Sequence, residues 1–352
     1  MTRFVDVSAL CRMVSRVGAD RFLCGIAAAM REDFRRWESF EMSARLASHS
    51  EIGVIELMPV SDRDRFAFKY VNGHPANANK GLPTVMAFGV LADVETGFPM
   101  LVAEMTLTTA FRTAAASAIA AEVLARRDSR VMGMIGCGAQ SEFQAIAFRE
   151  LVGIDELRIF DIDRSAMERL VRNLSHIPDL KVTPVVSAAD AARNTDIVTT
   201  CTADKALATI LTPDMIEPGM HINAVGGDCP GKTELHVDVL RNATIFVEFE
   251  PQTRIEGDIQ QLPGDHEVRE LWRVIAGKQT GRDSRDQVTV FDSVGFALED
   301  YSALRYVHEL ALAYDEGEDI ELVPALEDPR DLFGMVVDRA GPSGGAPVKS
   351  EA

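Results

Sequence analysis

The spacing of apolar residues divides the chain into regions that predict different kinds of structure. Residues 5–17 and 20–37 repeat apolar positions with the period of a helix that buries one face. From Ala44 onward the apolar residues form short runs of β-formers at 53–58, 66–71, 84–91 and 100–105, separated by turn-rich clusters. The first part of the chain therefore predicts helices followed by a β region with meander-like connections.

The middle of the chain alternates between strand and helix patterns. An alanine-rich helical segment at 108–125 leads into this region, which places a domain junction near Ala114. Strands are predicted at 131–135, 157–160, 181–186, 196–202, 221–225, 244–248 and 288–294, with helices between them. This alternation is typical of a doubly wound parallel sheet, the Rossmann-type α/β fold. A helical run at 296–314 is expected to return the chain to the first region, and the small, polar residues 342–352 are expected to be unstructured.

A glycine turn follows the first strand of this second region. It reads Gly136-Cys137-Gly138-Ala139-Gln140-Ser141, and the next strand ends in Asp161, 25 residues after Gly136. Glycines would let the backbone approach a pyrophosphate, and the N–H groups of the helix start would favour its negative charge. The acid would hold the adenosine ribose and select NAD over NADP. The alternative is an ordinary glycine turn, since Ser141 stands where a third glycine or alanine is usual.

Composition and charge narrow the class of protein. With 352 residues, 47% of them hydrophobic and 26% charged, the chain is long enough for two domains with buried cores. The net charge of -18 argues against nucleic acid or an anionic membrane surface as a partner. The chain has neither a signal pattern nor a run near the ~20 apolar residues of a membrane span, so a cytoplasmic protein is expected. Five scattered cysteines without a CxxC pattern predict reduced thiols and no metal site.

Three basic residues and one acid are candidates for chemistry. Arg45, Lys69 and Arg112 are isolated in apolar surroundings, where a strand residue of this kind usually points to solvent. If they converged on one cleft, they would form a clamp for a carboxylate. Asp228 follows a predicted strand and precedes a helix, at the sheet edge where ligands bind. It is either a helix cap or a carboxylate near the nicotinamide that accepts protons from an amine.

Five motifs together resemble the ornithine cyclodeaminase and mu-crystallin family. They are KYVNGHP around Lys69, TTAFRTAAAS around Arg112, GCGAQSEFQ after Gly136, AVGGDCPGKTEL around Asp228 and VFDSVGFALED around Ser293. The resemblance runs from about Arg45 to Tyr306. It is strongest to the bacterial ornithine cyclodeaminase branch, because the crystallin and alanine dehydrogenase branches depart from the motif near Asp228.

The resemblance implies roles for particular residues. Arg45, Lys69 and Arg112 would hold the α-carboxylate of the substrate, Asp228 would be the catalytic acid/base, and Val294 would line the substrate pocket. The positions implied for NAD are Thr84, Arg112, Ala139, Gln140, Asp161, Thr202, Val225, Gly226, Gly227, Asp228, Lys232 and Ser293. The implied organisation is an NAD-binding Rossmann domain at 114–304, a β-rich α+β substrate-binding and dimerisation domain at 1–113 and 305–340, and a disordered tail at 341–352. A homodimer through the β-rich domain is part of the implication.

The implied reaction converts L-ornithine into L-proline and ammonia. Bound NAD+ takes a hydride from Cα, the δ-amine attacks the resulting imino carbon, ammonia leaves, and the hydride returns to the cyclic imine. Such a site requires a carboxylate near both nitrogens and the exclusion of water. The alternatives are a net dehydrogenase or ketimine reductase on the same scaffold, such as alanine dehydrogenase, and a non-enzymatic, crystallin-like ligand-binding protein.

Overall fold

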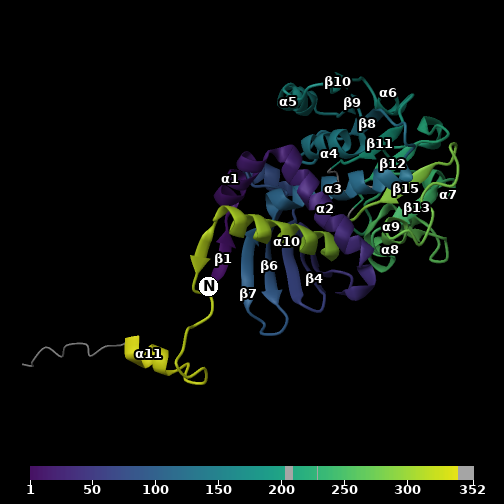
Figure 1. Ribbon diagram of the computed structural model, residues 1–352. Coiled ribbons are helices and arrows are strands. Elements are labelled where there is room, and N and C mark those ends of the chain that lie inside the picture. Colours follow the sequence, from purple (N-terminus) through teal and green to yellow (C-terminus); the bar gives the residue numbers. More distant parts are fainter. Residues whose placement is uncertain (203–208, 228, 340–352) are drawn as a thin grey trace, which may run out of the picture.

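Two eight-stranded sheets organise the computed structural model, which describes residues 1–202, 209–227 and 229–339 (Figure 1). The first sheet has the strand order β16-β1-β7-β6-β5-β4-β2, with β3 paired to β4. Its neighbouring strands are antiparallel except for β1 and β7, which run parallel. The strands are β1 (Thr2–Val5), β2 (Glu41–Met42), β3 (Leu46–Ser50), β4 (Gly53–Ser61), β5 (Arg65–Gly73), β6 (Val85–Asp93), β7 (Pro99–Glu104) and β16 (Glu318–Ile320).

In the described part of the chain, helices lie over one face of the first sheet. The apolar stripe of α2 (Ala19–Arg35) is fully buried, and α10 (Ala297–Tyr314) crosses the strands on the same side (Figure 1). Side chains along β4 alternate, so that Glu56 and Met58 face this layer while Ile55 and Leu57 face outward. The first sheet therefore has an inner face under helices and an apolar outer face.

The second sheet is parallel throughout and has helices on both faces. Its order is β10-β9-β8-β11-β12-β15-β13-β14. Phe246 and Phe291 pack with α3 and α9, whereas the alternate residues Ile245 and Val290 pack in the core that contains α6 and α7. This arrangement confirms the Rossmann-type α/β prediction. The strands are β8 (Val131–Ile135), β9 (Glu156–Phe160), β10 (Lys181–Pro184), β11 (Ile197–Thr200), β12 (His221–Ala224), β13 (Thr244–Val247), β14 (Arg269–Glu270) and β15 (Thr289–Asp292).

The remaining helices are short or join the two sheets. The joining helix α3 (Thr106–Leu124) is buried along most of its length, since small alanines allow close packing on several sides. The division expected at residues 113/114 and 304/305 falls inside α3 and α10, so we propose two domains that share these helices. The other helices are α1 (Val7–Val17), α4 (Ser141–Ala147), α5 (Arg164–Leu174), α6 (Ala188–Ala192), α7 (Val237–Arg241), α8 (Glu250–Glu256), α9 (Leu271–Ile275) and α11 (Gly334–Arg339).

Some boundaries differ from the predictions. The helix expected from Val5 begins at Val7, because Asp6 caps it by accepting a hydrogen bond from Ala9 N at 2.7 Å and residues 2–5 form β1. The predicted helix at 296–314 is confirmed as α10. The tail expected to be disordered, 341–352, lies outside the described residues.

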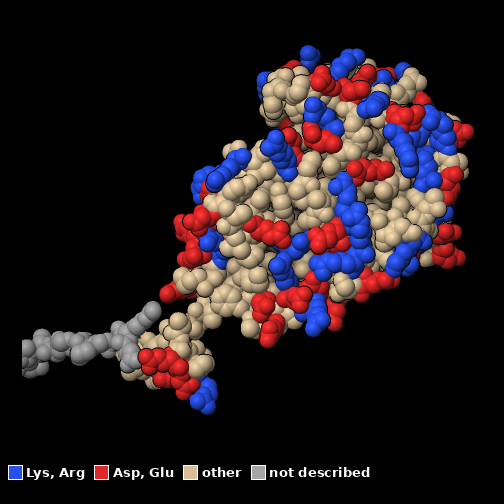
Figure 2. Space-filling view, in the orientation of Figure 1, with Lys and Arg blue, Asp and Glu red and all other residues tan. Residues whose placement is uncertain are grey.

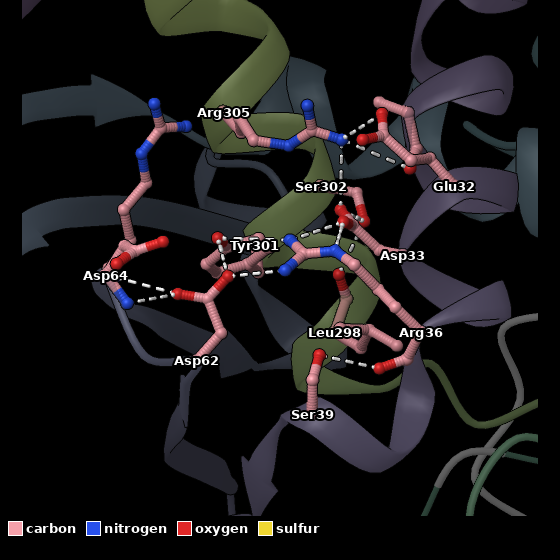
Figure 3. Close-up of polar contacts among 12 residues, drawn as sticks. Glu32, Asp33, Arg36, Ser39, Asp62, Asp64, Leu298, Tyr301, Ser302 and Arg305 are labelled. Atoms are coloured by element: carbon pink, nitrogen blue, oxygen red, sulfur yellow. Dashed lines mark hydrogen bonds and ion pairs between the residues drawn. The ribbon is translucent and has the colours of Figure 1, made fainter.

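A polar network anchors the start of α10 (Figure 3). Buried Asp33 accepts hydrogen bonds from Ser302 Oγ at 2.7 Å and Arg36 Nε at 2.8 Å. Arg36 also donates to Asp62 Oδ2 at 2.6 Å, an oxygen shared with the Tyr301 hydroxyl at 2.8 Å. These bonds hold α10 to α2 and to the turn between β4 and β5, because each charged partner is satisfied within the network.

Neither sign of charge dominates the face of the molecule that Figure 2 shows. Acidic and basic side chains are interspersed over most of it (Figure 2). Among the described residues, no helix combines the length and apolarity needed to cross a membrane.

Candidate active site

A cavity of about 420 Å³ lies between the inner face of the first sheet and the carboxyl edge of the second. This edge is the usual ligand site of an open α/β sheet. The residues proposed from sequence that line the cavity are Arg45, Lys69, Thr84, Arg112, Ala139, Gln140, Thr202, Val225, Gly226, Lys232, Ser293 and Val294. Asp161 and Gly227 are not part of its lining, and Asp228 lies outside the described residues. The fold thus brings together residues from both halves of the chain.

Lys69 and Arg112 form a buried pair of cations held by two acids of α10. Lys69 Nζ donates to Asp300 Oδ1 at 2.8 Å, and Arg112 Nε lies 3.0 Å from the same oxygen. Arg112 Nη1 donates to Glu299 Oε2 at 2.6 Å. Lys69 is 1% exposed, so the alternative of a solvated strand residue is wrong for this position. Buried charges of this kind require partners, and Asp300 serves both cations.

Arg45 uses more of its N–H groups in contacts within the protein than Lys69 and Arg112 do. Its Nη2 donates to the carbonyls of Val294 and Gly295, each at 2.7 Å, and its Nη1 donates to Glu56 Oε2 at 3.0 Å. Its Nε lies 3.2 Å from Glu256 Oε2. A guanidinium has five N–H groups. Arg45 therefore retains little free donor capacity, whereas Lys69 and Arg112 keep donors for a bound carboxylate.

Burial shifts the protonation of this cluster. Burial, with a smaller contribution from the charge of Arg112, lowers the pKa of Lys69 to about 8, while Asp300 opposes this shift. Burial also raises the pKa of Glu299 to about 8, against the effect of Arg112. Burial therefore favours the protonated form of Glu299 and opposes the charge on Lys69.

The glycine turn after β8 has the geometry expected of a dinucleotide site. Gly136 has φ +103°, and a Cβ there would lie 2.6 Å from the Cys201 carbonyl, so only glycine fits. A Cβ on Gly138 would meet open space at the cavity. Ser141 begins α4, and its Oγ donates to the Gly138 carbonyl at 2.7 Å. The Ser141 side chain therefore stabilises the turn by bonding to its backbone, which accounts for a serine at this position of the motif.

The turn fits a nucleotide at two further points. Asp161, which directly follows β9, accepts hydrogen bonds from the backbone N–H of Cys137 at 2.6 Å and of Asp163 at 2.8 Å. These bonds place its carboxylate beside the glycine turn, as a ribose contact requires. Gln140 Oε1 is buried and has no hydrogen-bond partner in the described part of the chain.

The described residues also include no cluster of side chains suited to a metal ion.

Sequence reasoning missed the buried acids around the cavity. Ser293 Oγ donates to Glu248 Oε1 at 2.6 Å, and the Thr202 backbone N–H donates to Glu234 Oε1 at 3.0 Å. Lys232 Nζ donates to the Thr202 carbonyl at 3.2 Å. The acids are Glu56, Glu234, Glu248, Glu256, Asp258, Asp292, Glu299 and Asp300. The signal that could have revealed Glu299 and Asp300 is the occurrence of adjacent acids inside the apolar motif VFDSVGFALED.

Comparisons with known proteins identify related sequences and folds. The model of the "Ornithine cyclodeaminase/mu-crystallin family" matches residues 7–315. An ornithine cyclodeaminase of Agrobacterium fabrum (strain C58) is 55% identical over 336 residues, covering 96% of this chain and 95% of the relative. An archaeal alanine dehydrogenase dimer with bound NAD is 34% identical, with a TM-score of 0.84 over 92% of this chain and 99% of that chain. A lysine cyclodeaminase, solved to explain recognition of L-lysine, L-ornithine and L-2,4-diaminobutyric acid, is 30% identical, with a TM-score of 0.85 over 94% and 98%.

Proposed function

The chain belongs to the ornithine cyclodeaminase/mu-crystallin family, and on this basis we propose that it converts L-ornithine into L-proline and ammonia with NAD as a recycled cofactor. The observation that carries the proposal is the cavity whose lining combines the buried cations Lys69 and Arg112 with the glycine turn and the carboxyl edge of the parallel sheet. The identity of 55% to an ornithine cyclodeaminase over nearly the whole chain supports it.

The substrate carboxylate is bound by Lys69 and Arg112 in this proposal. Each cation is held by α10 through only part of its donor set, so charge-assisted hydrogen bonds remain available to a ligand. Arg45 contributes its charge and ties the loop after β15 to the first sheet. The apolar cavity residues Val54, Met58, Val71, Val85 and Val294 limit water around the reacting carbon.

NAD is proposed to lie along the glycine turn, with Asp161 at its ribose and Thr202, Val225, Gly226, Gly227, Lys232 and Ser293 near the nicotinamide half. When bound, NAD supplies an acceptor and then a donor of one hydride. Asp228 is the proposed acid/base on motif evidence. Its carboxylate accepts a proton from the α-nitrogen before hydride loss, releases it, and then accepts one from the δ-nitrogen before ring closure, because each nitrogen must be neutral to react. It returns that proton to the departing α-nitrogen, which leaves as ammonia.

A homodimer through the outer face of the first sheet is part of the proposal. Strands β3 to β6 expose Leu46, Ile55, Leu57, Phe66 and Phe88 on that face, each between 38% and 65% exposed. Paired residues place Leu46, Leu57, Tyr70 and Phe88 in one row across the strands. A continuous apolar surface of this kind marks an interface, and the archaeal alanine dehydrogenase was solved as a dimer. We also propose a cytoplasmic location.

A net dehydrogenase is the second candidate, since an alanine dehydrogenase shares this fold at 34% identity. L-ornithine deuterated at Cα separates the two reactions. A cyclodeaminase takes the label from Cα and returns it to C2 of the ring, so proline keeps the deuterium and no NADH accumulates. Accumulation of NADH in proportion to ornithine consumed would establish the dehydrogenase instead, and loss of the label to solvent would exclude the recycled hydride. Asp228→Asn should abolish proline formation while the protein still binds NAD.

A further inference from the structure

Four buried carboxylates hold the loops at the carboxyl edge of the second sheet. Glu248, which follows β13, accepts hydrogen bonds from Ser293 Oγ at 2.6 Å and from the backbone N–H of Val294 and Gly295 at 3.3 and 3.2 Å. Asp292, at the end of β15, accepts from the backbone N–H of Asp258 at 3.0 Å and of Ile259 at 2.8 Å. Each acid therefore fixes a neighbouring segment.

Asp258 and Glu234 connect the loops around the proposed cofactor site in the same way. Asp258, which begins a short 3-10 helix after α8, accepts from the backbone N–H of Glu234 and Leu235, both at 2.8 Å. Glu234 in turn accepts from both the backbone N–H and the hydroxyl of Thr202. Through these contacts the loops that follow β11, β12 and β15 form one connected frame.

Gly226 and Gly227, the two residues before Asp228 in the sequence, pack directly against Glu234 and Asp258 of this frame. A Cβ on Gly226 would lie 2.0 Å from Glu234 Oε1, and a Cβ on Gly227 would lie 2.8 Å from Asp258 Oδ2. Neither glycine has a positive φ. Space, rather than backbone conformation, therefore requires glycine at both positions.

The remaining oxygens of these acids are buried beside the same backbone. Glu234 is 2% exposed and Asp258 is 0% exposed. Glu234 Oε2 and Asp258 Oδ2 have no hydrogen-bond partner among the residues that the structure describes. Burial raises the pKa of Asp258 to about 7, and the charge of Glu234 adds to this effect while Lys232 opposes it. Keeping such groups under a loop costs stability, which is typical of a functional site.

We propose that Asp258, together with Glu234, is a positioning residue for the acid/base, because their carboxyl groups pack against Gly226 and Gly227, the two residues that precede Asp228 in the sequence. The inference rests on the proposed role of Asp228. Asp258 touches neither substrate nor the reacting atoms in this scheme. It sets the position of the loop, and a shift of about 1 Å in a catalytic group can lower the rate about 100-fold.

Two variants of the full-length protein test this role. Asp258→Ala removes the acceptor of both N–H groups, and we expect kcat for proline formation to fall about 100-fold while KM for L-ornithine changes less than about threefold. Asp258→Asn keeps an oxygen in the same place, and we expect it to restore most of kcat. This split between kcat and KM, with rescue by asparagine, would not follow from a general loss of stability.

A matched control lies at the opposite edge of the sheet. Asp196 Oδ2 also accepts two consecutive backbone N–H groups, from Arg130 at 2.7 Å and Val131 at 2.9 Å. Asp196→Ala should lower the melting temperature without changing kcat of the folded protein. The inference is overturned if Asp258→Ala keeps the wild-type kcat, or if both alanine variants lower kcat equally.

Two further outcomes have defined meanings. If Asp258→Ala does not fold, Asp258→Ser takes its place, because its shorter side chain withdraws the acceptor from the Glu234 and Leu235 N–H groups and should lower kcat in the same way. Unchanged kcat in that variant also overturns the inference. If the unsubstituted protein forms no proline from L-ornithine, the proposed function fails, which is distinct from failure of the positioning role.

Discussion

Replacing Lys69 by methionine tests the carboxylate clamp. Methionine keeps an unbranched apolar stem in the 1% exposed site but removes the ammonium group. A charge-assisted hydrogen bond to a substrate carboxylate is worth roughly 1.5 to 3 kcal/mol. Since each 1.36 kcal/mol is a factor of ten, kcat/KM for L-ornithine should fall about 10- to 150-fold. NAD binding should be retained, because the glycine turn and Asp161 lie on the other sheet.

The variant should remain folded because two effects oppose one another. Asp300 loses Lys69 but keeps Arg112 Nε at 3.0 Å, so its charge does not become unpaired. Burial lowers the pKa of Lys69 from 10.5 to about 8, so the ammonium form destabilises the fold below pH 8 and this cost diminishes as the pH rises from about 8 to 10.5. Methionine removes that cost at neutral pH.

Steady-state kinetics and calorimetric titration with NAD+ measure the two quantities. Lys181→Met is the control, because Lys181 lies on edge strand β10 with a side chain 72% exposed. An unchanged kcat/KM in Lys69→Met, or an equal loss in Lys181→Met, would refute the clamp. A loss confined to NAD affinity would show that Lys69 binds the cofactor rather than the substrate.

Three other results are expected. Pentanoate, a carboxylate without an amine, should bind more weakly as the pH rises through about 8, because Lys69 then loses its proton. A calorimetric affinity for pentanoate that does not change with pH would exclude this dependence. The protein should bind NAD+ more tightly than NADP+, because a 2′-phosphate would meet the Asp161 carboxylate, and Asp161→Ala should narrow the preference; equal binding by the unsubstituted protein contradicts the role. Asp33→Ala should lower the free energy of unfolding in urea by about 3 kcal/mol, because Arg36 and Ser302 lose a buried partner; a change below about 1 kcal/mol would show that the network in Figure 3 contributes little.

Local patterns were sufficient to predict the elements that depend on neighbours in sequence. The order of strand, glycine turn and helix around Gly136 is confirmed, and so is the return helix at 297–314. Apolar periodicity and steric limits on φ act over a few residues, so they are visible in the sequence. Short strands such as β1 and β16 were not predicted, because three or four residues carry too little periodic signal.

The sequence by itself determined the α/β class, the glycine turn and the residue types available for a carboxylate and a dinucleotide. Only the tertiary structure decided which acids hold which cations. Lys69 and Asp300 are 231 positions apart, and Arg112 and Glu299 are 187 apart, so no local spacing connects them. A buried charge is stable only beside a partner, and that partner is set by how α10 packs across the first sheet rather than by its distance along the chain.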